Sequence, residues 1–422
     1  MARRMISCVC LSALAAFGMA SPFAQQPTAP TRAPNPAAAA PQPPVARSLE
    51  IHPDKTVTFR LAAPQAAEVT LNGSWDGAVN IRMTKDEGGV WSATVGPLGA
   101  QLWSYWYLVD GVKALDPGNA ETQRDGARYA SMLMISGAES ERWDFKDVPH
   151  GTVQAIWYPS PTLKLARRRM MVYTPPGYEA STQRYPVLYL LHGGGGDEDA
   201  WLVMGRANIV LDNLIAEGRA RPMVVVMPNG NATQTVSQGF GFGPTPAPQS
   251  VQAPLPPPLQ AAAGQRGGGP EGGRGPQSPQ PYAGSYPESL VKDVIPFVEK
   301  TFRVLNDKDD RAIAGLSMGG GHTLMATNNN PGVFGYIGVF SSGPRTVDET
   351  FEKQIDAVKA GGVKFYWLGA GTTDMAREGT VNLAELVKKH GFKTSYREIP
   401  GRHYWFLWRD FLAQFAQVMF SN

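Results

Sequence analysis

Cysteine and net charge are both scarce in this sequence. Of its 422 residues, two are cysteines, Cys8 and Cys10, and the formal net charge is +3. Both cysteines lie in a segment that we expect to be removed, so the mature chain would have no disulfide, zinc–thiolate site or cysteine nucleophile. The small net charge lacks the concentrated basic character expected of a nucleic-acid-binding protein. With 43% hydrophobic residues, the chain can nevertheless bury a large core.

Long hydrophobic runs are scarce as well. An apolar run follows Arg3 and Arg4, but it is too short and too interrupted for a confident transmembrane span. Basic residues, an apolar run and small residues in that order predict a secretory signal peptide over residues 1–24, with an uncleaved anchor as the alternative. We therefore expect an exported protein, periplasmic or extracellular, with no stable membrane insertion after signal removal.

The composition changes several times along the rest of the chain. Residues 25–47 are rich in alanine and proline and predict an extended linker. Residues 48–140 contain short strand-like runs separated by turn residues, which predicts an all-β sandwich module. From residue 147 to 422, buried-strand runs such as PVLYLLHG alternate with helical segments such as ANIVLDNLIAEG, which predicts a doubly wound, mostly parallel α/β sheet. Residues 239–285 interrupt it with a Pro/Gly/Gln-rich insertion, either disordered or a mobile cover.

One serine stands among four glycines where a predicted strand becomes a helix. The stretch RAIAGLSMGGGHTL matches the pattern G-x-S-x-G at Gly315, Ser317 and Gly319. A nucleophile at such a corner has a strained backbone, and side chains two positions away on either side would collide there. The following helix also directs free N–H groups at developing negative charge. We predict that Ser317 is the catalytic nucleophile; the alternative is a tight turn without chemistry.

A serine nucleophile needs a base and an acid, and the order of the strands selects among six histidines. The base should follow the last strands of the sheet, which favours His403 in REIPGRHYWFLW. The acid should lie between serine and histidine in sequence. Asp374 ends VKFYWLGAGTTD, a strand followed by a glycine-rich turn, and is our prediction, with Asp348 and Glu378 as rivals.

The oxyanion hole needs two backbone donors. One should be the N–H of Met318, and the second should come from the HGGGG run that follows the strand PVLYLL. Gly194 is the predicted second donor, and we place Gly195 and His192 among the substrate-binding residues. Because no further ligand cluster stands near His192 or His322, we expect no metal site there.

Several of these motifs occur together in an order typical of one family. They are RRRMMVYTPPGYEASTQRYPVLYLLHGGGG, MVVVMPNG, GLSMGGG, GAGTTD and PGRHYWFLWRDF. Over residues 147–422 the chain resembles the esterase-D-type α/β hydrolases, and within them carbohydrate esterase family 1, the feruloyl and acetyl xylan esterases. The resemblance implies the same triad of Ser317, Asp374 and His403. It also implies that Trp405 sits beside the histidine and helps to shape the acyl pocket.

The β-rich segment carries a resemblance of its own. LNGSWDG and WSYWYLVDGVKALDPGN resemble the early-set, immunoglobulin-like modules that precede isoamylases and glycogen-branching enzymes. Some such modules bind glycans, and the aromatic residues here could either stack on sugars or pack a core. The insertion at 239–285 departs from the family pattern and leaves the pocket shape open.

Together these features predict a secreted serine carboxylic-ester hydrolase that removes feruloyl or acetyl groups from plant polysaccharide such as xylan through an acyl-enzyme, without a cofactor. Its partner would be an acylated oligo- or polysaccharide. An enterochelin-type siderophore esterase is the alternative, since that group also pairs an early-set module with this core. An acyltransferase, or a glycan-binding protein with a non-catalytic hydrolase scaffold, is a further alternative.

Overall fold

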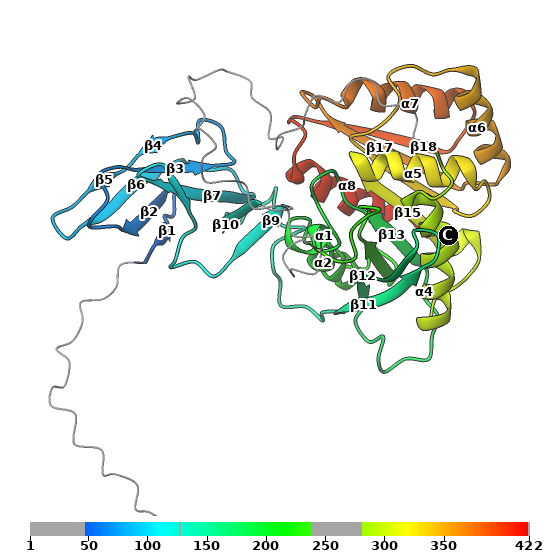
Figure 1. Ribbon diagram of the computed structural model, residues 1–422, viewed down its shortest axis with the longest axis horizontal. Helices are drawn as coiled ribbons and strands as arrows, with labels where there is room; N and C mark the ends of the chain where they lie inside the picture. The colour runs from blue at the N-terminus through cyan, green and yellow to red at the C-terminus, as the bar shows by residue number, and fades with distance from the viewer. Residues whose placement is uncertain (1–46, 126–127, 238–280, 421–422) are drawn as a thin grey trace, which may run out of the picture. The chain divides into compact units, whose positions relative to one another are not determined.

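The computed structural model describes residues 47–125, 128–237 and 281–420 (Figure 1). The predicted signal peptide, the linker up to residue 46, both cysteines and the insertion as far as residue 280 lie outside the described residues. From Arg47 onward the chain forms one unit.

The N-terminal part of this unit is built from two antiparallel sheets. One has the strand order β1-β2-β6-β5, and the other has the order β4-β3-β7-β10-β9, with β8 paired to β7. Their strands are β1 (Leu49–Ile51), β2 (Val57–Ala62), β3 (Val69–Gly73), β4 (Ile81–Arg82), β5 (Thr84–Lys85), β6 (Val90–Val95), β7 (Leu102–Val109), β8 (Val112–Ala114), β9 (Thr122–Asp125) and β10 (Arg128–Met134). Both sheets contribute to one core around Phe59, Leu71 and Tyr105. We refer to these two sheets as the β-rich module.

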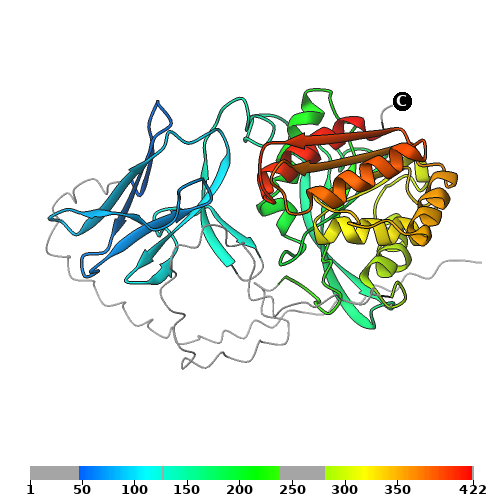
Figure 2. The same ribbon diagram turned by 90° about the horizontal axis from the view of Figure 1, so that it is seen from above.

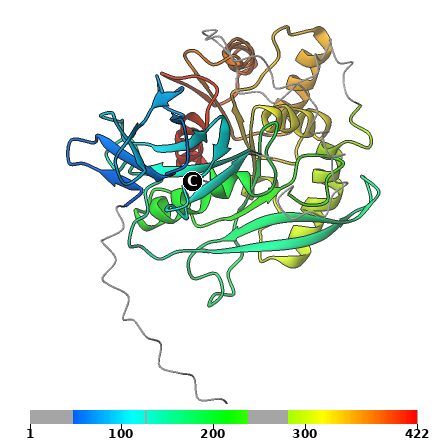
Figure 3. The ribbon, with the colours of Figure 1, turned by 60° about the vertical axis from the view of Figure 1, so that its left-hand side comes forward.

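A single eight-stranded sheet forms the rest, in the order β11-β12-β14-β13-β15-β16-β17-β18. Its strands are β11 (Thr152–Ser160), β12 (Leu165–Thr174), β13 (Val187–Leu191), β14 (Val224–Pro228), β15 (Arg311–Leu316), β16 (Tyr336–Phe340), β17 (Phe365–Gly371) and β18 (Thr394–Ile399). The strands from β13 to β18 are parallel to their neighbours within that run, as the alternation of buried strands and helices predicted. The antiparallel hairpin of β11 and β12, which was not predicted, adds two strands at one edge (Figure 3).

Helices cover both faces of this sheet (Figure 2). They are α1 (Ala200–Val203), α2 (Ala207–Ala216), α3 (Tyr286–Ser289), α4 (Ile295–Thr301), α5 (Met318–Asn329), α6 (Glu349–Ala360), α7 (Arg377–Lys389) and α8 (Trp405–Val418), with a π-helical turn at Leu290–Val294 and a 3₁₀ turn at Lys308–Asp310. Side chains of α3 to α7 pack on one face, and those of α1, α2 and α8 pack on the other.

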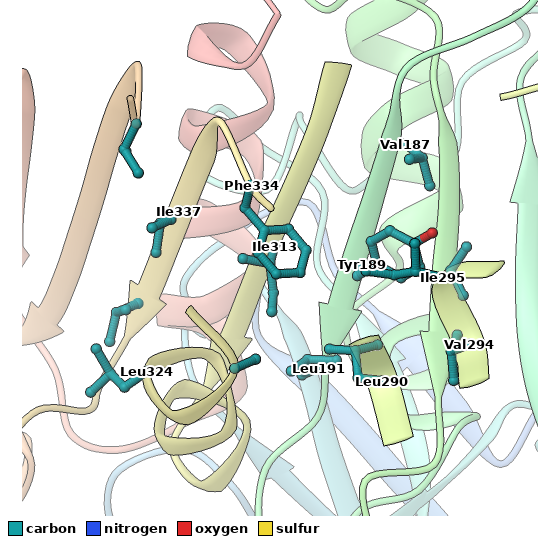
Figure 4. Close-up of a cluster of buried hydrophobic side chains, with 14 of the residues drawn as sticks. Val187, Tyr189, Leu191, Leu290, Val294, Ile295, Ile313, Leu324, Phe334 and Ile337 are labelled. Atoms are coloured by element: carbon teal, nitrogen blue, oxygen red, sulfur yellow. The ribbon is translucent and has the colours of Figure 1, made fainter. Parts of the chain in front are cut away.

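Alternation along β13 shows why this sheet is doubly wound. Val187, Tyr189 and Leu191 point into the core that α4 and α5 cover (Figure 4), whereas Leu188 and Leu190 belong to the core under α2 and α8. All five residues of the strand are buried. A strand that is apolar throughout is stable where helices cover both of its faces. Because the strands from β13 to β18 are parallel, the loops that follow them lie at the same edge of the sheet.

Candidate active site

Ser317 occupies the corner between β15 and α5. Its backbone has φ 52° and ψ −115°, a left-handed conformation that is strained for any residue except glycine. The Ser317 N–H donates to the carbonyl of Phe340 at 2.9 Å, and its own carbonyl accepts from the Gly321 N–H at 3.1 Å. These two bonds, one to the next strand and one within the helix, hold the serine in the strained conformation.

Close backbone contacts explain the glycines on either side of the serine. A Cβ atom at Gly315 would lie 2.1 Å from the carbonyl oxygen of Gly319, and one at Gly319 would lie 2.5 Å from that of His192. A Cβ at Gly320 would lie 2.4 Å from the Cβ of Ser342, whereas one at Gly321 would meet nothing within 4 Å. Side chains are therefore excluded where the motif predicts it, and Gly321 is not constrained in this way.

His403 follows β18 and is bonded to Asp374, which follows β17. The distance from His403 Nδ1 to Asp374 Oδ1 is 2.8 Å, and the Asp374 side chain is completely buried. Burial alone would raise the pKa of Asp374, but hydrogen bonding from His403, with further contributions from Ser341 and the Ala376 N–H, lowers it below its ordinary value. An ionised carboxylate on this side keeps the proton on Nδ1 and leaves Nε2 as an acceptor.

Two residues that the sequence analysis did not select also contact this pair. The Trp408 ring packs edge-on against His403 with centroids 4.9 Å apart, and its Nε1 donates to Ser341 Oγ at 2.9 Å. Trp405, the residue predicted to lie beside the histidine, is buried between Trp201 and Trp408. Residues 405 and 408 lie about one turn apart on α8. The ring that contacts His403 is that of Trp408, and the ring of Trp405 packs against Trp408.

Ser317 and His403 line one pocket of about 260 Å³. Its other walls come from the loops after β16 and β17 and from the first turn of α7: Ser341, Ser342, Gly343, Arg345, Met375, Ala376 and Gly379. The serine and the histidine thus meet at the carboxyl edge of the parallel strands, where the buried aspartate bonded to the histidine follows β17. Exposed Arg345 makes no ion pair with any residue in the described ranges, so it presents a positive charge to this pocket.

The glycine run after β13 lies against Ser317. A Cβ at Gly193 would be 3.4 Å from the Cβ of Ser317, and Gly194 faces open space. His192 is buried; its Nδ1 lies 2.8 Å from the Gly193 carbonyl, and its Nε2 accepts from the Gly230 N–H at 2.8 Å. Burial lowers the pKa of His192, which keeps the ring neutral with its proton on Nδ1. Both ring nitrogens therefore bind backbone groups, and His192 fixes the loop that contains Gly194.

The other predicted oxyanion-loop residues have defined places. Met318 is the first residue of α5, where the backbone N–H groups have no partner within the helix. Gly195 has φ 82° and forms part of the turn that the Gly196 N–H closes on the Gly193 carbonyl at 3.1 Å. Neither Gly194 nor Gly195 is among the residues that line the pocket.

The rival residues lie elsewhere. Asp348 accepts from the Phe351 N–H at 2.8 Å and caps α6, and Glu378 is exposed in the first turn of α7. His150 bonds to Asp212, and His390 bonds to Asp356. Neither the two rival acids nor these two histidines line the pocket of Ser317. Within the described ranges, no group of three or more His, Cys, Asp or Glu side chains is arranged to hold a metal ion.

The sheet, the strained serine corner and the loops that carry the aspartate and the histidine are those of an α/β hydrolase. Comparison with known proteins gives the family: the model described as "Putative esterase" matches residues 162–254 and 265–418. The chain belongs to this esterase family, and within it resembles the feruloyl esterases of carbohydrate esterase family 1.

Curated relatives and solved structures agree with this family. An endo-1,4-β-xylanase/feruloyl esterase of Xylanibacter ruminicola is 30% identical over 86% of this chain and 44% of its own. An uncharacterized protein of Corynebacterium glutamicum is 25% identical over 58% of this chain and 55% of its own. The chain thus spans about half or less of the length of these relatives. The enterobactin esterase of Shigella flexneri shares the fold with a TM-score of 0.58 at 18% identity, covering 86% of this chain and 93% of its own.

In the part of the chain that the structure describes, no helix has the length and apolar character needed to cross a bilayer.

Two glycines of α5 form a matched pair for testing the serine corner. In Gly319→Ala the new methyl group would overlap the backbone carbonyls of Leu191 and His192, so we expect a loss of about 1–3 kcal/mol in the free energy of unfolding, together with lower activity. In Gly321→Ala the methyl group enters open space, and stability should stay the same or rise by at most about 1 kcal/mol. Urea unfolding of both variants measures the difference; equal effects would contradict the close-contact explanation.

Asp374→Asn tests the role of the buried carboxylate. The amide no longer holds the proton on Nδ1 of His403, so kcat for p-nitrophenyl acetate should fall by about 10⁴-fold while the fold is retained. Asp348→Asn is the matched control, since asparagine also caps a helix and should leave both rate and stability unchanged. A comparable loss of rate in the control would show that the acid has been assigned wrongly.

Burial of His322 gives stability a pH dependence. Burial, followed by the nearby His192, lowers the pKa of His322 to about 4. An exposed histidine binds its proton near pH ~6.5. Between about pH 6.5 and 4 the unfolded chain therefore binds more protons than the folded chain, and the free energy of unfolding falls as the pH falls. Urea unfolding across this range should show a shallower decline in His322→Gln than in the wild type; identical slopes would refute this.

Proposed function

We propose that this protein is a serine carboxylic-ester hydrolase. The observation that carries the proposal is that Ser317 and His403 line the same pocket while His403 is bonded to a buried aspartate. Ser317 Oγ attacks the ester carbonyl as His403 Nε2 takes its proton. The C–O bond to the alcohol then breaks, and the alcohol leaves with that proton. Water, deprotonated by the same histidine, releases the acid from the acyl-enzyme and restores the serine.

The negative charge of the tetrahedral intermediate needs donors, and we assign these to the backbone N–H groups of Met318 and Gly194. Support comes from the position of Met318 at the start of α5 and from the glycine run that lies against Ser317. Loss of one such donor typically costs about 3 kcal/mol of transition-state stabilisation.

The proposed substrate is a feruloyl or acetyl ester on plant polysaccharide such as xylan, and we infer that the protein is exported. The xylanase/feruloyl esterase relative, which is aligned with 86% of this chain, supports this choice of substrate. The β-rich module would be an early-set, immunoglobulin-like module. Trp75, Trp91 and Tyr107 are buried in its core, which favours packing over glycan contact for these three aromatics.

A siderophore ester is the second candidate, and two observations favour it. The fold shared with the enterobactin esterase extends over 86% of this chain, a share larger than the eight-stranded sheet and its helices alone. The pocket is also lined by Arg345, whose guanidinium would attract an anionic catecholate. The same positive charge would suit any ester that carries a negative charge near its carbonyl.

A substrate panel on the purified chain, with Ser317→Ala as the control, tests the function. Methyl ferulate and acetylated xylan should be hydrolysed faster than a tri-catecholate ester, and Ser317→Ala should lose at least about 10³-fold in kcat on each. Equal rates for Ser317→Ala and wild type on p-nitrophenyl acetate would end the enzyme proposal and favour a binding protein. Preference for the tri-catecholate would favour the siderophore reading, and transfer to an added sugar acceptor would identify an acyltransferase.

A further inference from the structure

An arginine of the β-rich module reaches the loop that continues the glycine run. Arg124, on β9, bonds through Nη1 and Nη2 to both oxygens of Asp197, and its Nη2 also lies 2.9 Å from Asp199 Oδ2. The Asp197 side chain is only 3% exposed and that of Arg124 11%. A bidentate guanidinium–carboxylate ion pair that is nearly buried is strong, and it restricts the relative orientation of the two side chains.

The same acidic loop is also bound by the eight-stranded sheet. Arg169, on β12, lies 2.7 Å from Glu198 and 3.1 Å from Asp199. The three consecutive acidic residues therefore lie between one arginine of the sheet and one of the module. Removing one partner of a buried ion pair leaves an uncompensated charge, so the position of this loop depends on both arginines.

Asp197 is directly continuous with the proposed oxyanion loop. It follows Gly196, whose N–H closes the turn onto Gly193 at 3.1 Å, and Gly194 lies inside that turn. The Gly196 carbonyl accepts from Asn231 Nδ2 at 2.9 Å. A shift of Asp197 would therefore move the end of a short, hydrogen-bonded turn whose other end is fixed by His192.

The module also contacts the loop that contains His403. Tyr404 follows His403 in sequence, and its Oη lies 3.3 Å from Ser104 Oγ. Arg409 of α8 is buried and donates to Gln101 Oε1 at 2.9 Å and to the carbonyl of Leu102 at 3.3 Å. These contacts come from the loop before β7 and from β7 itself, so the module touches the segment around His403 and α8 as well as the loop of Asp197.

We propose that Arg124 is a positioning residue for the oxyanion loop, and that the β-rich module serves catalysis by holding this loop. The inference rests on the proposed ester hydrolysis. If so, the module is needed for the hydrolysis of small esters that have no sugar part. A module that acted only in glycan binding would not affect the rate on such esters.

Arg124→Ala and Arg124→Lys, assayed as full-length chains on p-nitrophenyl acetate and methyl ferulate, test the proposal. We expect Arg124→Ala to lower kcat by about 10–100-fold, less than the loss of a whole oxyanion donor, with KM changed by less than about threefold. Arg124→Lys should recover part of the rate. The matched control is Arg60→Ala, which removes an ion pair with Glu50 inside the same module and should leave the rate unchanged.

A second readout distinguishes positioning from general loss of structure. A boronic acid forms a tetrahedral adduct with the serine and uses the oxyanion donors, whereas ferulate, the product, does not need them. In Arg124→Ala the inhibition constant of phenylboronic acid should rise by about the same factor as kcat falls, while ferulate binding stays constant. Equal weakening of both ligands would overturn the proposal.

A double variant that removes both charges of one pair separates positioning from misfolding. Arg124→Gln with Asp197→Asn removes the Arg124–Asp197 pair, while Asp199, the second partner of Arg124, keeps its ion pair with Arg169. The double variant should therefore unfold cooperatively like the wild type while still losing rate. A folded double variant with wild-type kcat would refute the positioning role. Full activity of Ser317→Ala would instead refute the ester-hydrolase mechanism, whereas an inactive Ser317→Ala beside fully active Arg124 variants would refute this inference alone.

Discussion

The contact between the first turn of α5 and the end of β13 is the constraint on which the candidate site depends. Because a Cβ at Gly319 would lie 2.5 Å from the His192 carbonyl, the helix can begin this close to the sheet only with glycine there. The same approach holds Ser317 in its left-handed conformation and brings the Gly193 turn against it. Ser317 and the loop proposed to stabilise the tetrahedral intermediate are thus positioned by one backbone contact, so neither can move without the other.

Buried carboxylates determine how the side chains around this contact are oriented. Asp374 and Asp197 are both nearly inaccessible to water. Asp374 is bonded to the His403 ring, and Asp197 accepts from the Arg124 guanidinium. In such surroundings an unmatched charge is costly, so the position of the partner is strongly restrained. Asp374 restrains the ring of His403 in this way, and Trp408 supports that ring from the side.

Local patterns predicted the parts of the site that depend on local geometry. The glycines around Ser317 are required by contacts within a few residues and the adjacent strand, so the motif alone identified the corner. Asp374 and His403 followed from strand order, and the structure brings them together at 2.8 Å. The hairpin of β11 and β12 was not predicted, because the buried Arg168 within it interrupts the apolar pattern. Its guanidinium bonds to backbone carbonyls such as that of Asn231, 63 residues away, and no local pattern indicates this.

Strand β7 shows how one strand can serve the core and the catalytic loops at once. Tyr105 and Tyr107 on one face are fully buried in the core of the module. On the alternate face, Leu102 and Ser104 are also buried. The Ser104 hydroxyl lies 3.3 Å from that of Tyr404, the residue after His403, and the Leu102 backbone carbonyl accepts from Arg409. Since successive residues of a strand point to opposite sides, burial on both sides means that β7 has a second partner beyond its own core. That partner is the segment from Tyr404 to Arg409, so the buried aromatic residues of β7 pack the module core while its other face packs on the segment that follows His403.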